Sequence, residues 1–368
     1  MRIHIIGTRG YPSTYGGFET LVRHLAPYLV GHGHTVTVFD RDHGRRASGH
    51  RARSIDGVRV YSSRGFEGVR SSTLSHGLTS SVVAAKERPD VVLAMNVANG
   101  FFLPILRARR VPVVFNVDGI EWERDKWSPL GKFVFFTAAR ATARWADALI
   151  ADSLAIAERW RQDFGRTSTF VPYGGDPRTE RPNSDRVVEL GLKPGQYVLI
   201  VARLVPENNV TTMLDAAKAS GAPTVVVGSG GGTALEKSVF AQHDPPRVLT
   251  LGHVADQGLL AALWAHCGVY LHGHSVGGTN PALVQALGLG APVLAYGTVF
   301  NREVLVREEM LVSLDIESIV SRIHELLSSD ALRTSFAEWG RSRVAEMYNW
   351  EAVCARYEAV LRGIARLE

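Results

Sequence analysis

The chain has 368 residues, of which 45% are hydrophobic and 21% are charged, as in an ordinary soluble globular protein. This length exceeds what one compact core usually serves, so two domains are expected. No run of about 18 apolar residues occurs, so we expect no transmembrane helix. Two cysteines, Cys267 and Cys354, exclude a disulfide framework and a cysteine-based metal cluster. The opening MRIHIIGTRG is typical of a strand and not of a signal peptide, which favours the cytoplasm.

The chain carries a formal net charge of +5 and has a pI of about 9.3, and six of its 41 basic residues are lysine. A positive surface suits anionic substrates or an anionic membrane surface. The arginines are scattered and are not interleaved with aromatic residues on one segment, so we expect no nucleic-acid partner.

Strand-like and helix-like patterns alternate from the amino terminus. Short apolar runs predict strands at Arg2–Ile6, Thr35–Phe39, Val58–Tyr61, Val91–Ala94, Val113–Asn116, Ala148–Ala151 and Ser168–Val171. Such alternation predicts a parallel sheet with helices on both faces, and therefore an α/β fold class.

A glycine-rich stretch, GTRGYPSTYGGFET, joins the first strand to the first helix, which Pro27 is expected to bend. The helix is indicated by apolar residues at helical spacing, namely Phe18, Leu21, Val22, Leu25 and Leu29. The stretch exceeds the usual connection of about 2–6 residues and lacks the G-x-G-x-x-G dinucleotide fingerprint. A glycine-rich turn before a helix is a typical place for a phosphate or a small polar ligand. A plain surface loop is the alternative.

The segment Pro172–Asp185, PYGGDPRTERPNSD, breaks all periodicity and is predicted to be a domain linker. The alternation then restarts, with strands expected at Tyr197–Ala202, Thr224–Gly228, Val248–Leu251, Val269–Leu271 and Val293–Ala295. Helical patterns over Ile316–Leu327 and Ala331–Met347 and one last helical segment complete the chain. In open sheets of this kind ligands bind at the carboxyl ends of the strands.

Arg203 directly follows an apolar strand and precedes a helix that we predict to be capped by Asn208 or Asn209. An arginine at a strand end beside a helix N-terminus suits a phosphate, because its guanidinium donates two hydrogen bonds to phosphate oxygens. The alternative is a surface arginine paired with Glu207.

Asn280 followed by Pro281 predicts a helix start, with Asn280 as N-cap and proline in the first helical position. Gly277, Gly278 and Thr279 precede it and offer backbone N–H groups and a hydroxyl. The helix dipole and these donors favour an anion. A capped helix with a glycine turn is the alternative.

His253 lies between a strand and a helix in the stretch GHVADQ. It is either a structural histidine or a ligand contact. We predict that backbone around Gly252–Val254 forms a slot for a nucleotide base.

Several of these segments resemble one enzyme family. ARLVPENN, GHV, HGHSVGGTNPALVQALGLGAPV and YNWE resemble the carboxyl half of glycosyltransferase family 4 enzymes of the GT-B fold. GTRGYPSTYGGFET, NVDGIEWERDKW and VPYGGD resemble its rhamnosyltransferase-like subgroup, whose N-terminal domain long carried a domain-of-unknown-function label. The resemblance covers essentially the whole chain. It implies two Rossmann-like domains whose parallel sheets face a cleft: an acceptor-side domain over 1–172, a nucleotide-sugar domain over 173–345 and a helix over 346–368 that crosses back.

The resemblance also implies transfer of a sugar from a nucleoside-diphosphate donor with retention at the anomeric carbon. The glycine loop of the family lies near the donor phosphates, and Gly16 and Gly17 match it. The donor contacts that we expect are Gly16, Gly17, Arg203, Asn208, His253, Val254, Gly277, Gly278, Thr279, Asn280 and Gln285. The acceptor contacts that we expect on the N-terminal domain are Tyr15, Glu19, Asn96 and Glu121.

Three positions depart from the family pattern. Asn208 stands where the family has a lysine, and Gly277 and Gln285 stand where it has two glutamates, for the donor sugar and the ribose. Glycine at the first of these two positions resembles the subgroup, whereas glutamine at the second does not. Gln285 still forms hydrogen bonds with ribose hydroxyls but carries no charge. The choice among GDP, dTDP and UDP donors stays open, as does a catalytically degenerate protein that only binds nucleotide.

The catalytic-region histidine of the family falls near Asp118, in NVDGIEW. We expect Asp118 to bind the sugar or the acceptor and to assist proton transfer; a turn residue before Gly119 is the alternative. A front-face transfer is implied, in which Arg203 stabilises the departing diphosphate. Asp40 and Asp42 resemble the D-x-D of metal-dependent transferases but are interpreted as strand-end charges, and we expect neither a metal nor another cofactor.

The sequence leaves the identity of the acceptor undecided between two classes. The subgroup implies a rhamnosyl-type transfer in polysaccharide assembly, often to a lipid-linked acceptor. The arginine-rich composition also fits natural-product enzymes that glycosylate small soluble hydroxyl or thiol acceptors. The basic, aromatic segment Gly131–Leu149 either touches the inner face of a membrane as a peripheral contact or is a half-buried helix that covers the first sheet.

Two other enzyme classes are alternatives. A GT-B nucleotide-sugar epimerase would act on the donor without an acceptor. A Rossmann dehydrogenase would need G-x-G-x-x-G after the first strand, and GTRGYPSTYGG lacks it.

Overall fold

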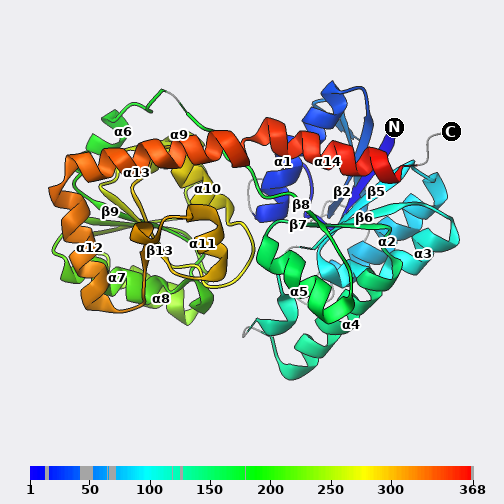
Figure 1. The fold of residues 1–368 in the computed structure, drawn as a ribbon, viewed down its shortest axis with the longest axis horizontal. Helices are drawn as coiled ribbons and strands as arrows, with labels where there is room; N and C mark the ends of the chain where they lie inside the picture. Colours follow the sequence, from blue (N-terminus) through cyan, green and yellow to red (C-terminus); the bar gives the residue numbers. More distant parts are fainter. Residues whose placement is uncertain are drawn as a thin grey trace. The chain divides into compact units, whose positions relative to one another are not determined.

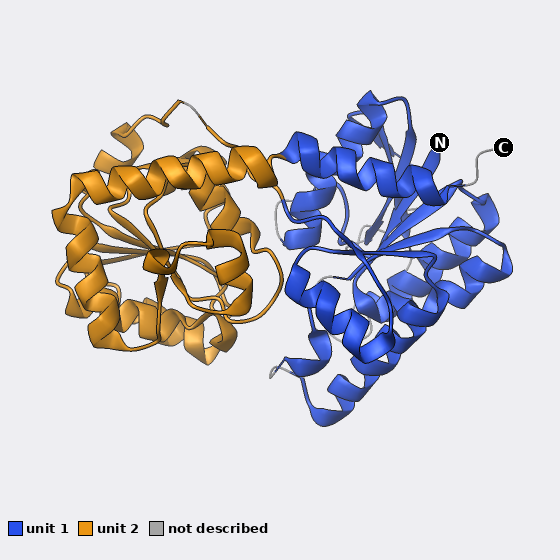
Figure 2. Cartoon of the chain, viewed as in Figure 1, with its two compact units in different colours: residues 1–173, 350–368 blue, residues 174–349 orange. Residues whose placement is uncertain are grey.

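The computed structural model describes residues 1–12, 16–41, 53–63, 65, 72–117, 119–124, 127–178 and 180–365. The chain forms two compact units, which Figure 2 colours separately. Unit 1 comprises Met1–Tyr173 and Trp350–Glu368, and unit 2 comprises Gly174–Asn349. The change from one unit to the next falls within the segment predicted to be a linker. None of the described helices combines the length and apolarity that crossing a bilayer requires.

Unit 1 is built on a sheet with the strand order β3-β4-β2-β1-β5-β6-β7-β8. Its strands are β1 (Arg2–Ile6), β2 (Thr35–Arg41), β3 (Arg53–Ile55), β4 (Val58–Ser63), β5 (Val91–Met95), β6 (Val113–Asn116), β7 (Ala148–Ala151) and β8 (Thr169–Phe170). All seven predicted strands are present and pair in parallel. The strand β3 was not predicted, because an antiparallel edge strand of three residues without a buried side chain has no apolar pattern.

Helices cover both faces of this sheet, with α1 and α14 on one side and α2, α3 and α4 on the other (Figure 1). The helical segments are α1 (Gly17–Gly31), α2 (Ser72–Glu87), η1 (Val97–Phe102), α3 (Leu103–Ala108), η2 (Glu121–Glu123), α4 (Pro129–Trp145), α5 (Leu154–Phe164) and α14 (Trp350–Ile364). The predicted apolar face of α1 is confirmed, because Leu21, Val22, Leu25 and Leu29 are fully buried. The last helix belongs to unit 1, where the Tyr357 hydroxyl accepts a 2.5 Å hydrogen bond from Asn116 Nδ2.

Unit 2 contains a parallel sheet with the order β11-β10-β9-β12-β13-β14. Its strands are β9 (Val198–Val201), β10 (Thr224–Val227), β11 (Val248–Gly252), β12 (Val269–His272), β13 (Val293–Tyr296) and β14 (Leu311–Val312). The five predicted strands are present, and their side chains supply much of the core of this unit. The strand β14 was not predicted, since two residues are too few to form a pattern.

The helices of unit 2 also form two layers, with α9, α10 and α13 on one side of the sheet and α7, α8 and α12 on the other (Figure 1). The segments are α6 (Asp185–Val188), η3 (Pro206–Asn208), α7 (Val210–Ala219), α8 (Ala234–Phe240), α9 (Gln257–His266), α10 (Pro281–Gly288), α11 (Val299–Leu305), η4 (Glu308–Met310), α12 (Ile316–Ser328), α13 (Asp330–Arg343) and η5 (Val344–Tyr348). The predicted helix over Ala331–Met347 is therefore α13 followed by a π-helical turn, η5.

Candidate functional site

The carboxyl ends of the unit 2 strands bring most of the predicted donor residues to one edge of the sheet. Arg203 follows β9, Gly228 follows β10, His253 follows β11 and Gly273 follows β12. Because these strands are parallel neighbours, the loops after them lie side by side.

Hydrogen bonds join the loop after β9 to the loop after β12. Asn209 Nδ2 donates to the Gly273 carbonyl at 2.8 Å. The Glu207 carbonyl accepts from both the backbone N–H of Ser275, at 2.9 Å, and its hydroxyl, at 2.7 Å. A Cβ at Gly273 would lie 2.5 Å from the Asn208 carbonyl oxygen, so only glycine allows this approach. These contacts therefore hold the two loops together at the carboxyl edge of the sheet.

The prediction that Asn208 or Asn209 caps α7 with its side chain is wrong. Asn209 occupies the cap position, but its backbone is left-handed, with φ of +50°, and its side chain makes no capping bond. The Asn208 side chain is 3% exposed and donates to the Arg203 carbonyl at 2.8 Å. Both amides hold the loop together, and a sequence pattern cannot distinguish such a contact from a cap.

Arg203 is exposed, and its guanidinium carries no hydrogen bond or ion pair within the part of the chain that the structure describes. The alternative of a surface pair with Glu207 is therefore not found. Glu207 Oε1 is itself buried without a hydrogen bond to any described residue. The arginine fork is thus available to an anion at the edge of the sheet.

The predicted start of α10 is confirmed. Asn280 Oδ1 accepts from the Ala282 N–H at 3.0 Å, and Pro281 occupies the first helical position. Gly277 has φ of +113°, and a Cβ added there would meet nothing within 4 Å, so the space beside it is open. Thr279 is buried, whereas Gln285 is half-buried on the helix. Open space before a helix N-terminus suits an anion.

The loop after β10 has the sequence GSGGG, Gly228–Gly232, and its N–H groups bind a carboxylate of the same unit. The Glu236 carboxylate accepts from the N–H groups of Gly230, at 2.9 Å, and Gly232, and these bonds lower the pKa of the carboxyl group. Glu236 was not predicted to have a role in this loop. Its position could have indicated this contact, because Glu236 lies in the first turn of α8, four residues after the last glycine of GSGGG.

After β11, His253 is exposed and Val254 is half-buried against the core. Gly252 has φ of +64° and pairs in register with Val227 of β10. These residues lie at the same edge of the sheet as Arg203, next to the glycine loop.

In unit 1, the glycine-rich loop after β1 is held by Glu19, which is 5% exposed in the first turn of α1. Its Oε1 accepts from the Arg9 N–H at 2.9 Å. Gly16 has φ of +121°, and a Cβ there would lie 2.2 Å from Glu19 Oε2. A Cβ at Gly17 would lie 3.2 Å from the Tyr173 hydroxyl. Close packing inside unit 1 thus accounts for Gly16.

Two other residues predicted to contact the acceptor also have partners in their own loops. Asn96, with φ of +65°, accepts from the Ala98 N–H at 3.2 Å. Glu121 Oε2 accepts from Trp127 Nε1 at 2.9 Å, and its Oε1 pairs with Arg124 Nε at 2.9 Å. The predicted residues Tyr15 and Asp118 lie outside the described residues.

The D-x-D stretch is described only in part, because Asp42 lies outside the described residues. Asp40 is near the end of β2, and its Oδ2 pairs with Arg53 Nη2 at 2.9 Å. Among the described residues, no three histidine, cysteine or carboxylate side chains gather as a metal site would require.

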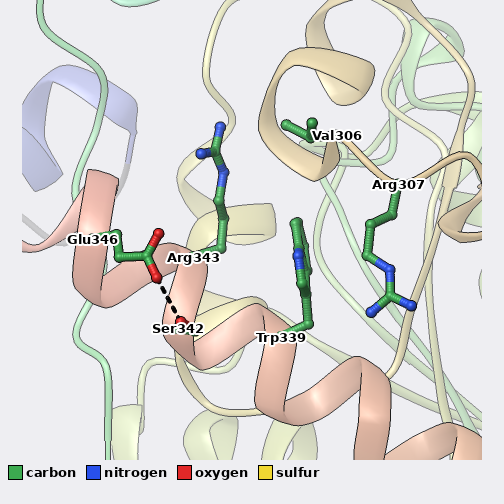
Figure 3. A pocket seen from close by; sticks show the side chains of 6 residues that line it. All are labelled: Val306, Arg307, Trp339, Ser342, Arg343 and Glu346. Carbon is green, nitrogen blue, oxygen red and sulfur yellow. Dashed lines mark hydrogen bonds between the residues drawn. The ribbon is translucent and has the colours of Figure 1, made fainter.

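A cavity of about 330 Å³ lies elsewhere in unit 2, between α13 and the residues after α11 (Figure 3). Its lining comprises Val306, Arg307, Trp339, Ser342, Arg343 and Glu346. Ser342 donates to Glu346 at 2.7 Å, and Arg343 Nε donates to the Val304 carbonyl at 3.3 Å. None of the predicted donor residues lines this cavity, and its polar groups have partners, so the edge near Arg203 is the better candidate site.

Comparisons with known proteins agree with this fold. A model of glycosyltransferase family 4 matches residues 15–178, and a model of glycosyl transferases group 1 matches residues 185–343. A search of curated protein sequences gives no match.

Three solved structures illustrate the likeness. Sucrose-phosphate synthase from Thermosynechococcus elongatus has a TM-score of 0.83 and 18% identity, covering 98% of each chain. Anabaena Alr3699/HepE in complex with UDP has a TM-score of 0.75 and 17% identity, covering 99% of this chain and 100% of that one. The E. coli trehalose-6-phosphate enzyme bound with UDP-2-fluoro glucose has a TM-score of 0.76 and 12% identity, covering 99% and 100%.

The paired parallel-sheet α/β units define a GT-B fold, which these solved structures share. The two family models together span most of the chain, and the chain belongs to glycosyltransferase family 4.

Proposed function

We propose that unit 2 binds a nucleoside-diphosphate sugar and that unit 1 presents the acceptor, with transfer that retains the anomeric configuration and needs no metal. The observation that carries the proposal is Arg203, an exposed guanidinium without an ion pair among the described residues, at the edge of the sheet where α10 begins. A diphosphate is the anion that suits an arginine fork and a helix N-terminus together.

In this proposal the chemical step depends on the departing diphosphate. Arg203 and the backbone N–H groups before Pro281 stabilise the negative charge that develops as the glycosidic bond to the diphosphate breaks. Gln285 forms hydrogen bonds with the ribose, and the backbone around Val254 holds the base. Asp118 binds the sugar or the acceptor and assists removal of the acceptor proton.

The solved structures with similar folds favour a uridine nucleotide among the three donor classes. Alr3699/HepE was solved with UDP, and the E. coli trehalose-6-phosphate enzyme with UDP-2-fluoro glucose. We propose two classes of acceptor. One is a hydroxyl group of a growing polysaccharide, which would receive a rhamnosyl-type sugar, and the other is a small soluble compound with a hydroxyl or thiol group. The contacts inside the unit 1 loops make Glu19 and Glu121 parts of the loop structure, so acceptor recognition would depend more on Tyr15 and Asp118.

We further propose a cytoplasmic protein with a peripheral contact at an anionic membrane surface through α4. Leu130 is 72% exposed and Phe133 is 66% exposed in the first two turns of this helix. The helix contains no acidic residue, and its exposed Arg140 and Arg144 lie beyond these apolar side chains. An apolar end followed by exposed arginines suits the interface of an anionic bilayer.

Calorimetric titration with GDP, UDP and dTDP in EDTA tests the donor proposal. We expect micromolar binding of one nucleotide without added metal. With the matching nucleotide sugar and an acceptor, the anomeric signals in the NMR spectrum of the product should show the same configuration as the donor. Absence of binding by all three nucleotides would contradict the proposal. Binding without turnover of any donor would instead favour a degenerate nucleotide-binding protein.

A further inference from the structure

Two histidines at the carboxyl end of β12 form a stacked pair that the proposed donor contacts do not include. The rings of His272 and His274 lie nearly parallel, with centroids 4.2 Å apart and an interplanar angle of 11°. His272 ends the central strand β12 and is 1% exposed, whereas residue His274, in the loop that follows, is half-buried. The pair therefore extends from the core to the edge of the sheet.

The inner ring is fixed by hydrogen bonds. The Tyr270 hydroxyl donates to the Val201 carbonyl at 3.3 Å and lies 3.0 Å from His272 Nδ1. A hydrogen bond in either direction between the Tyr270 hydroxyl and His272 Nδ1 fixes the plane of the ring. His272 is thereby held in one orientation and presents its flat face to His274.

The backbone around the outer ring is fixed as well. The His274 carbonyl accepts from Asn301 Nδ2 at 3.0 Å, and the same amide donates to the Tyr296 carbonyl at 2.8 Å. The next residue, Ser275, is bonded to the Glu207 carbonyl. Stacking on one side and these bonds on both sides of the chain leave the imidazole of His274 little freedom to turn.

The outer ring is neutral and lies in the field of Arg203. Burial and the nearby Arg203 charge lower the pKa of His274 to about 3. His274 Nδ1 is buried without a hydrogen bond to any described residue. Because Nδ1 is buried and the residue as a whole is half-buried, Nε2 is the nitrogen that a ligand can reach.

We propose that His274 is a further donor-site residue, whose Nε2–H donates to a phosphate oxygen of the nucleoside diphosphate beside Arg203. This inference rests on the proposed function. A buried nitrogen without a partner costs less as an unprotonated acceptor than as an N–H donor, so the hydrogen of the neutral His274 ring lies on Nε2, where a ligand can accept it. A phosphate held by Arg203 supplies the acceptor, and a neutral donor adds a hydrogen bond without placing a second cation next to the arginine.

The test compares nucleoside diphosphate with the matching nucleoside in calorimetric titrations. The titrants are GDP, UDP and dTDP, and then guanosine, uridine or thymidine for the nucleotide that binds. We expect His274→Ala to weaken diphosphate binding by about tenfold to hundredfold and to leave nucleoside binding unchanged. His274→Gln should recover most of the affinity, because its amide nitrogen reaches the position of Nε2. His274→Asn should not, because its amide lies near Nδ1.

The possible results separate the role of His274 from the proposed binding of a nucleotide. Equal diphosphate affinity in His274→Ala and the unaltered protein would overturn the role of His274 alone. An equal loss for diphosphate and nucleoside, or rescue by asparagine and not by glutamine, would mean that His274 only supports the loop, and would overturn the contact. Failure of the unaltered protein to bind any of the three nucleotides would overturn the proposed function and this inference together. Thermal unfolding of each variant shows whether it is folded.

Discussion

At the carboxyl edge of the unit 2 sheet, Arg203 is exposed, and its guanidinium makes no hydrogen bond or ion pair with the described residues. At the same edge of the unit 1 sheet, Glu19 is buried and accepts a hydrogen bond from the Arg9 N–H, and Glu121 is paired with Arg124. Both units thus carry polar residues after their strands, as the sequence patterns indicate. In unit 2 the guanidinium of Arg203 is available to a ligand. In unit 1 the carboxylates of Glu19 and Glu121 bind to groups of their own loops.

The two kinds of side chain differ in the hydrogen bonds that they can form within a glycine-rich motif. A carboxylate near a glycine loop satisfies backbone N–H groups before it contacts any ligand, because unpaired donors are costly. Glu19 in unit 1 and Glu236 in unit 2 both do this. A guanidinium cannot accept a hydrogen bond from the backbone, so an arginine at a strand end remains available more often.

The largest expected effect comes from the backbone contact that brings β10 next to β9. A Cβ at Gly228, where φ is +146°, would lie 1.8 Å from the Ala202 carbonyl oxygen. We expect Gly228→Ala to lower the free energy of unfolding by about 3 kcal/mol or more and to abolish diphosphate binding. Gly221, with φ of +73° and open space around it, is the control, and Gly221→Ala should cost only about 1 kcal/mol. Similar losses in denaturant unfolding of the two variants would contradict this account.

The next effect tests the structural role of Glu19 in unit 1. Glu19→Ala leaves the Arg9 N–H without its acceptor, and we expect a loss of about 2 kcal/mol in the free energy of unfolding. Glu19→Gln keeps one acceptor oxygen and should recover about half of that loss. Limited proteolysis should show earlier cleavage near the glycine loop in the alanine variant. If Glu19→Ala were as stable as the unaltered protein and lost only acceptor binding, the assignment of Glu19 to the loop would be wrong.

Acidification should affect the two units unequally. Burial lowers the pKa of His4 in unit 1 to about 4, and burial also lowers the pKa values of His272 and His274 in unit 2. These groups are neutral when folded but take up protons near pH 6.5 when unfolded, so stability falls as pH drops below about 6.5. At pH 5 the loss from His4 is about 2 kcal/mol.

Hydrogen exchange at pH 7.5 and pH 5, corrected for intrinsic rates, measures this difference. We expect the core strands of unit 2 to lose more protection than those of unit 1, because burial lowers the pKa of three described histidines in unit 2, namely His266, His272 and His274. Equal losses in the two units would contradict the prediction.

The smallest effect concerns the membrane contact proposed for α4. We expect the double variant Leu130→Ser, Phe133→Ser to bind about tenfold more weakly to vesicles of phosphatidylcholine and phosphatidylglycerol in a ratio of about three to one. Leu78, 43% exposed on α2 in the same unit, is the control, and Leu78→Ser should bind as the unaltered protein does. Equal binding of the unaltered protein to vesicles of phosphatidylcholine alone would argue against an electrostatic contact.

Much of the fold could be predicted from the sequence, because buried parallel strands are continuous apolar runs such as Val91–Met95 and because Asn280-Pro281 is a strong helix start. The short edge strand β3 could not, since its pairing depends on β4 and not on its own three residues. The hydrogen-bond partners of side chains could not be predicted from the sequence pattern either. Whether Asn209 caps α7 or bonds to Gly273 is decided by a loop 64 residues further along the chain.

The most direct test of the central claim is diphosphate binding by Arg203→Ala and by a matched control. Arg247 is exposed in the same unit but precedes β11, at the opposite end of the strands. We predict that Arg203→Ala weakens binding of the cognate nucleoside diphosphate by about tenfold to hundredfold in calorimetric titration, while Arg247→Ala binds as the unaltered protein does. Equal affinities of the two variants would contradict the assignment of the donor site to the carboxyl edge of unit 2.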